Sequence, residues 1–169
     1  SRQILFTKKD IGKFKANISG NRVKKINRKI NIKIFKQRIE KNNIDKIARK
    51  YKIICDGTDN FKSRFLINDY CMKNKKVLIS SAINKYDGQL FTFDFRKKTP
   101  CYRCFMPKAP NEELNCDSDG VMTTLAGIAG SLQANEVIKS ILNLKSGFDG
   151  NIMVFNALSS KFRKIKLLK

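Results

Sequence analysis

Residues 51–60 read YKIICDGTDN, and this stretch decides the fold class of the 169-residue chain. The short apolar run over 51–55 predicts a buried strand, and the turn-forming residues 56–60 predict a functional loop directly after it. The spacing of apolar side chains predicts a helix over 61–74, and residues 77–79 predict the next buried strand. A strand, a helix and a strand within this length predict a right-handed parallel crossover, the repeating unit of α/β sheets.

The segment before this unit predicts two helices and one further strand. A helix capped by Asp10 is expected to end near Asn27, because apolar residues recur between them at helical spacing. Strict alternation of apolar and polar residues over 30–34 predicts a half-buried strand. A short helix over 44–50 then leads into the apolar run.

The segment after this unit predicts three strands and a long helix. Alternating phenylalanines predict a strand over 89–95 that is covered on one face, and a long apolar helix follows over 120–144. Strands over 152–155 and 162–167 are expected to form a hairpin. The fold class is therefore α/β: one domain over 1–169 with a partial, Rossmann-like doubly wound sheet and additional antiparallel strands toward the C-terminus.

Length and composition favour a single-domain protein that is neither exported nor inserted in a membrane. A length of 169 residues with 41% hydrophobic content suits a single domain. The sequence holds no run of about 18 apolar residues, and its start is not a charged-then-apolar signal. We therefore expect an unexported, cytoplasmic protein that does not contact membranes.

The chain is strongly basic, with 36 Lys and Arg against 14 acidic residues and a formal net charge of +22. Such a balance raises nucleic acid as a partner. The basic residues are spread along the chain, however, without a glycine-arginine tail or zinc-finger spacing. Lys, Asn and Ile are abundant together, which is typical of compositional drift. The distribution makes a nucleic-acid partner the weaker interpretation.

Histidine is absent, which excludes mechanisms that need an imidazole base within this chain. The five cysteines are expected to be reduced, because an odd number in an unexported chain does not suit a disulfide framework. Cys55 and Cys71 are expected to be buried as small apolar side chains.

Several motifs follow one another along the chain: Arg2-Gln3, DIGKFKA at 10–16, CDGTDN at 55–60 with Arg64 and Asn68, CYRC at 101–104, and Cys116 with GVM at 120–122. In this order and approximate spacing they resemble the ThiF/MoeB/HesA adenylyltransferases, relatives of the ubiquitin-activating enzymes. The resemblance covers nearly the entire chain. It implies ATP-dependent activation of the C-terminal carboxylate of a ubiquitin-like sulfur-carrier protein, for thiamine or molybdenum cofactor synthesis.

The resemblance assigns a nucleotide role to several residues. Asp59 is expected to orient Mg-ATP, since Mg²⁺ prefers carboxylate oxygens; the alternative is that it only caps the following helix. Arg2 and Lys15 are expected to meet phosphate oxygens as catalytic cations, or else to be solvated surface charges. Gln3 and Asn60 are the further expected contacts to ATP.

Arg64 is a weaker candidate for contacting phosphate. Its alternative role is that of an ion-pair partner on the surface of the helix.

Cys101 and Cys104 have the spacing of half a four-thiolate zinc site. In the family a second cysteine pair near the carboxyl terminus completes a structural site. The alternatives for this pair are a redox couple or two unreactive thiols.

Cys116 lies in a polar segment before the long helix, and in the thiamine branch of the family the matching cysteine can be linked covalently to the carrier. An exposed, unreactive thiol is the alternative.

The resemblance also implies a homodimer and a glycine-rich phosphate loop. That loop, with the first strand and helix and the second cysteine pair, is not found in these residues, so we expect them alone to bind Mg-ATP poorly. The rival functions are a non-catalytic scaffold that docks a ubiquitin-like partner, and a basic nucleic-acid-binding domain.

Overall fold

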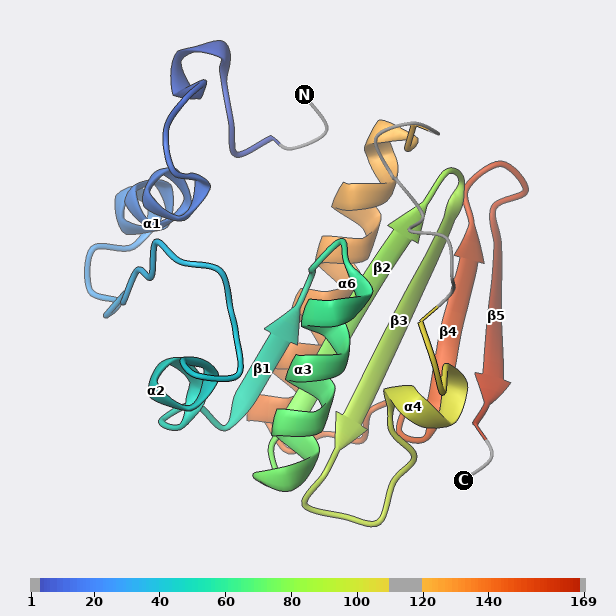
Figure 1. Cartoon of the computed structure of the whole chain (residues 1–169). Coiled ribbons are helices and arrows are strands. Elements are labelled where there is room, and N and C mark those ends of the chain that lie inside the picture. The colour runs from blue at the N-terminus through green and yellow to red at the C-terminus, as the bar shows by residue number, and fades with distance from the viewer. Residues whose placement is uncertain (1–3, 110–119, 168–169) are drawn as a thin grey trace. The chain divides into compact units, whose positions relative to one another are not determined.

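The computed structural model describes residues 4–109 and 120–167 (Figure 1). Two compact units divide the chain, residues 1–39 and residues 40–169, and each has its own internal packing. None of the described helices is long and apolar enough to cross a membrane.

The first unit contains the 3-10 turn η1 (Lys8–Asp10) and the helix α1 (Lys15–Ile26). The prediction that the helix begins at Asp10 is therefore wrong. Gly12 has a φ of 79° and interrupts the helical path. The Asp10 carboxylate instead accepts hydrogen bonds from the amide and hydroxyl of Thr7 and forms an ion pair with Arg22 at 2.9 Å.

The predicted strand over 30–34 is also wrong, because these residues form no strand. A strand needs a neighbour for its backbone hydrogen bonds, and no other strand lies within the described part of this unit. The alternating isoleucines serve a different purpose. Ile32 and Ile34 pack on α1 at Gly20, where a Cβ atom would meet the Ile34 side chain.

The second unit contains the predicted crossover and the elements that follow it. Its described elements are α2 (Ile44–Ala48), β1 (Ile53–Asp56), α3 (Phe61–Lys73), β2 (Val77–Asn84), β3 (Asp87–Asp94), α4 (Tyr102–Phe105), α6 (Thr123–Ile141), β4 (Asn151–Asn156) and β5 (Lys161–Lys166). The predictions for α2, β1, α3, β2, α6 and the two last strands are confirmed within a few residues.

One five-stranded sheet with the order β1-β2-β3-β4-β5 organises this unit. β1 and β2 are parallel, as the crossover predicts, with Ile53 opposite Val77 and Asp56 opposite Ser80. The other neighbours are antiparallel, and β4 and β5 form the predicted hairpin. Helices α3 and α4 lie on one face of the sheet and α6 on the other (Figure 1). The expected α/β architecture with antiparallel strands toward the C-terminus is confirmed.

β3 is covered on both faces, not on one. Leu90 packs in the core beneath α6 with Leu125. Phe91, whose side chain points to the opposite face, lies 5.5 Å from the Tyr102 ring of α4, measured between ring centres. The sequence prediction failed because Thr92, a polar residue on the α6 face, is also buried and donates a hydrogen bond to Glu136.

Two glycines of this unit have opposite surroundings. Gly88 of β3 lies beneath the buried Phe155 ring of β4, so that a Cβ atom at Gly88 would overlap the ring. Gly127 of α6 is exposed and has no neighbouring atom within 4 Å of the Cβ position among the described residues. Only the first glycine is therefore required by packing.

The substitutions Gly88→Ala and Gly127→Ala should shift stability in opposite directions. Gly88→Ala overpacks the core and should cost about 1–3 kcal/mol of unfolding free energy. Gly127→Ala should add about 0.5–1 kcal/mol, because alanine favours an exposed helix. Urea denaturation followed by circular dichroism measures both changes. Equal stability of the two variants would contradict the packing at Gly88.

Candidate functional site

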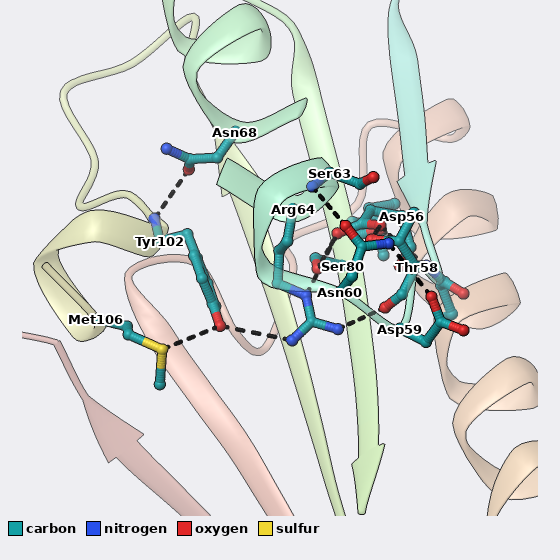
Figure 2. Close-up of polar contacts among 12 residues, drawn as sticks. Asp56, Thr58, Asp59, Asn60, Ser63, Arg64, Asn68, Ser80, Tyr102 and Met106 are labelled. Atoms are coloured by element: carbon teal, nitrogen blue, oxygen red, sulfur yellow. Dashed lines mark hydrogen bonds and ion pairs between the residues drawn. The ribbon is translucent and has the colours of Figure 1, made fainter. Parts of the chain in front are cut away.

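The loop after β1 is built around the buried carboxylate of Asp56, the last residue of that strand (Figure 2). The amide and hydroxyl of Thr58 donate to Asp56 Oδ1 at 2.9 and 2.7 Å, which closes a tight turn. The Ser80 hydroxyl on β2 donates to Asp56 Oδ2 at 2.8 Å. One carboxylate therefore fixes the loop to both parallel strands.

Gln133 of α6 holds the end of β1 in place from the opposite face of the sheet. Its side-chain amide nitrogen donates to the carbonyl oxygens of Asp56 and Ile79 at 2.9 and 2.8 Å. These carbonyls belong to adjacent strands, so α6 is tied to β1 and β2 just before the loop begins. The backbone that enters the loop is held from two sides.

Asn60, and not Asp59, caps α3. The Asn60 side-chain oxygen accepts a hydrogen bond from the Ser63 amide at 2.8 Å. The Asp59 carboxylate is exposed and accepts one bond, at 3.3 Å, from the Asn60 side-chain amide. The interpretation of Asp59 as a helix cap is therefore wrong, and most of its acceptor capacity faces solvent.

Arg64 is buried beneath the loop, so its interpretation as an ion-pair partner on the helix surface is wrong, whereas its contact with phosphate stays a prediction. Its Nη2 donates to the Thr58 carbonyl at 2.6 Å, and its Nε lies 3.7 Å from Asp56 Oδ2. The side chain is 10% exposed. The guanidinium therefore supports the loop from within and does not point to solvent.

Cys101 and Cys104 lie side by side where α4 begins, with their sulfur atoms 3.9 Å apart. Two thiolates bound about 2.3 Å from one tetrahedral zinc ion lie about 3.8 Å apart, so the pair fits two of its four positions. Within the described residues, no third Cys, Asp or Glu joins them in a metal-binding group.

The other expected site residues either belong to the first unit or fall outside the described residues. Lys15 belongs to the first unit, where it is the exposed first residue of α1 and its ammonium lies 5.7 Å from the centre of the Phe6 ring. Arg2, Gln3 and Cys116 fall outside the described residues. The structure therefore brings together Asp59 with Asn60, and Cys101 with Cys104.

The two remaining cysteines differ from each other. Cys71 is fully buried, as predicted, and burial raises the pKa of its thiol to about 12. Cys55 is exposed on the edge strand β1, so its predicted burial is wrong. The prediction assumed that the whole apolar run faced a core, whereas β1 has a sheet neighbour only on its β2 side among the described strands.

Sequence reasoning missed the residues that shape the loop. Asp56 and Ser80 occupy paired positions on the parallel strands, which only the register reveals. Gln133 is a single polar residue on a long helix and gives no signal of its own. Tyr102 stands between the two cysteines and resembles an ordinary core aromatic residue, although its position within the CYRC motif is a usable signal.

The fold is that of an α/β protein, and the loop lies at the carboxyl end of a parallel strand, the position at which such folds commonly bind ligands. The whole chain, residues 1–169, matches the ThiF family. The chain therefore belongs to the ThiF family, and the resemblance inferred from the motifs is confirmed.

Sequence relatives agree with this family, and solved structures share the fold. The chain is 42% identical over 170 residues to a probable molybdopterin-synthase adenylyltransferase of Porphyra purpurea, covering 99% of this chain and 44% of that protein. It is 33% identical over 170 residues to a sulfur carrier protein adenylyltransferase of Thermus thermophilus, covering 97% of this chain and 63% of that protein. The fold matches the crystal structure of E. coli MccB with ATP at a TM-score of 0.81 and 18% identity, covering 98% of this chain and 52% of that one. The chain thus spans about half the length of these proteins.

Stability measurements should separate Asp56 from Asp59. Asp56→Asn leaves the buried Arg64 without its carboxylate and should cost about 2–4 kcal/mol of unfolding free energy. Asp59→Asn changes an exposed side chain and should stay within about 0.5 kcal/mol of the wild type. Urea titration of the two matched variants measures both. A neutral Asp56→Asn would show that the carboxylate does not organise the loop.

Proposed function

We propose that this protein uses ATP to adenylate the C-terminal carboxylate of a ubiquitin-like sulfur-carrier protein. The observation that carries the proposal is the exposed Asp59 carboxylate, left uncommitted because Asn60 caps α3. It lies in the loop after a parallel strand, where α/β folds bind their ligands. The names of the relatives agree with this reaction.

The proposed chemistry needs charges in place and no proton-accepting imidazole. The carrier carboxylate is already a nucleophile; it attacks the α-phosphate of ATP, and pyrophosphate leaves. Cationic groups favour this step by compensating the charge that develops on the phosphate oxygens. Arg2 and Lys15 are the proposed cations, with Gln3 and Asn60 as further contacts to the nucleotide.

Asp59 is the proposed holder of Mg²⁺, which would neutralise phosphate charge when bound. A single exposed carboxylate suits this ion, because Mg²⁺ retains several waters and takes few protein ligands. The tight turn closed on Asp56 fixes the backbone one residue before Asp59. The loop can therefore present the carboxylate without ordering a flexible segment at each turnover.

The proposal extends to the domain, its location and oligomeric state, its zinc ligands and its biosynthetic branch. The adenylation domain is proposed to include both units of the chain and to act in the cytoplasm as a homodimer, with Cys101 and Cys104 as zinc ligands. The molybdenum cofactor branch is favoured by the names of relatives in Porphyra purpurea and Pyropia yezoensis, which are 42% and 38% identical. In the thiamine branch, Cys116 would form the covalent link to the carrier.

Carrier-dependent exchange of labelled pyrophosphate into ATP tests the reaction. The full-length protein should catalyse this exchange, and Asp59→Asn should lower it at least about 100-fold by removing the Mg²⁺ ligand. A variant of the exposed Asp87, Asp87→Asn, serves as the matched control and should retain activity. Carrier binding without any exchange in the wild type would instead support a non-catalytic scaffold.

Metal analysis tests the cysteine pair separately from catalysis. The full-length protein, in which a second cysteine pair would complete the site, should contain zinc, and Cys104→Ser should lower its zinc content to below about one tenth, since a structural site needs all four ligands. Cys55→Ser removes an equally exposed thiol and should leave the zinc content unchanged. Inductively coupled plasma mass spectrometry gives the stoichiometry, and equal zinc in all three proteins would exclude the pair as ligands.

A further inference from the structure

The helical turn α4, which carries the cysteine pair, is fastened to α3. The Tyr102 amide donates to Asn68 Oδ1 at 2.9 Å, and the Arg103 guanidinium forms two bonds to the Asp69 carboxylate at 2.8 and 2.7 Å. The Arg103 guanidinium also lies 4.5 Å from the centre of the Phe65 ring. These contacts set the position of α4 by the middle of α3.

The Tyr102 side chain extends this connection toward the first turn of α3. It is 1% exposed, and its hydroxyl accepts a hydrogen bond from Arg64 Nη1 at 3.5 Å. The same hydroxyl donates to the Met106 sulfur at 3.6 Å, and Figure 2 shows it between that sulfur and the Arg64 guanidinium. The Tyr102 ring centre lies 5.7 Å from the central guanidinium carbon of Arg64.

Arg64 carries the connection onward to the loop. Its guanidinium is planar, so a contact at Nη1 also sets the direction of Nη2, which donates to the Thr58 carbonyl at 2.6 Å. The Nε atom is buried and has no hydrogen-bond partner among the described residues. Among the described residues, the hydrogen bonds of the guanidinium are therefore those at its two ends, to Tyr102 and Thr58, beside the ion pair with Asp56.

We propose that Tyr102 is a positioning residue for Asp59 and acts through Arg64. The proposal rests on the proposed function, in which Asp59 holds the Mg²⁺ of Mg-ATP. The chain of contacts runs from the Tyr102 hydroxyl through Arg64 to the Thr58 carbonyl, and Asp59 is the next residue. Tyr102 lies between Cys101 and Cys104. Any change in the conformation of the turn that carries these cysteines is therefore transmitted through the same contacts to the loop after β1 that contains Asp59.

Amide hydrogen exchange at Thr58 tests the connection without relying on catalysis. The Thr58 amide is held by Asp56, so its exchange reports the order of the turn. Tyr102→Phe removes only the hydroxyl and should raise this exchange rate about tenfold. Tyr70→Phe is the matched control, because it removes from α3 a tyrosine hydroxyl that donates to Asp45 at 3.0 Å and takes no part in the contacts of Tyr102 with Arg64. It should leave exchange at Thr58 unchanged.

A second variant separates transmission through Arg64 from a general loss of packing. If Tyr102 acts through the guanidinium, Tyr102→Phe should have no further effect on Thr58 exchange in an Arg64→Lys background. The Mg²⁺ concentration for half-maximal pyrophosphate exchange should rise at least about threefold in Tyr102→Phe and stay constant in Tyr70→Phe.

Unchanged exchange at Thr58 in Tyr102→Phe overturns the proposal, as does an equal effect of Tyr70→Phe. Additive effects in the double variant overturn the route through Arg64. A failure of the proposed function appears differently, as pyrophosphate exchange that survives Asp59→Asn.

Discussion

The burial of the Asp56 carboxylate is the constraint on which the rest of this site depends. A carboxylate can be withdrawn from water only when hydrogen bonds and a compensating charge replace its hydration. Here Thr58 and Ser80 supply the hydrogen bonds, and Arg64 supplies the charge. Meeting these requirements brings β1, β2 and α3 to one point, and the backbone between them has little freedom left.

A division of labour within the CDGTDN motif follows from this constraint. The Asp56 carboxylate is buried and bonded to neighbouring strands and loop residues, Asn60 caps the helix, and the Asp59 carboxylate is exposed to solvent. The two acidic residues of the motif therefore have opposite environments, although the sequence alone presents them as similar. Because the neutral Asn60 caps the helix, the Asp59 carboxylate stays exposed, as its proposed role in holding Mg²⁺ requires.

Much of the second unit could be predicted from sequence, because apolar periodicity reports burial directly. The crossover, the long helix and the final hairpin follow that signal. The periodicity signal failed where it does not match burial. The isoleucines over 30–34 alternate but have no partner strand, and Thr92 is a polar residue that is buried in the core. Cys55 was expected to be buried because an edge strand and a central strand look alike in a short apolar run.

The candidate site was predictable only in part. Asp59, Asn60 and the cysteine pair were found through their motifs, whereas the supports around them depend on contacts distant in sequence. The bond from Gln133 to the Asp56 carbonyl and the contact of Arg64 with Tyr102 arise from the packing of separate elements. No local pattern encodes such contacts, since the partners lie on separate helices and strands far apart in the sequence.

The close approach of Gly88 and Phe155 has a consequence for how sequences of this family diverge. The ring occupies the space that a side chain on β3 would need, so the two positions share one volume across the sheet. Among homologues they are expected to vary together, a larger residue at the first accompanying a smaller one at the second. Conservation of this glycine would then reflect the space that the neighbouring aromatic ring needs. It would not indicate a turn or a contact with phosphate.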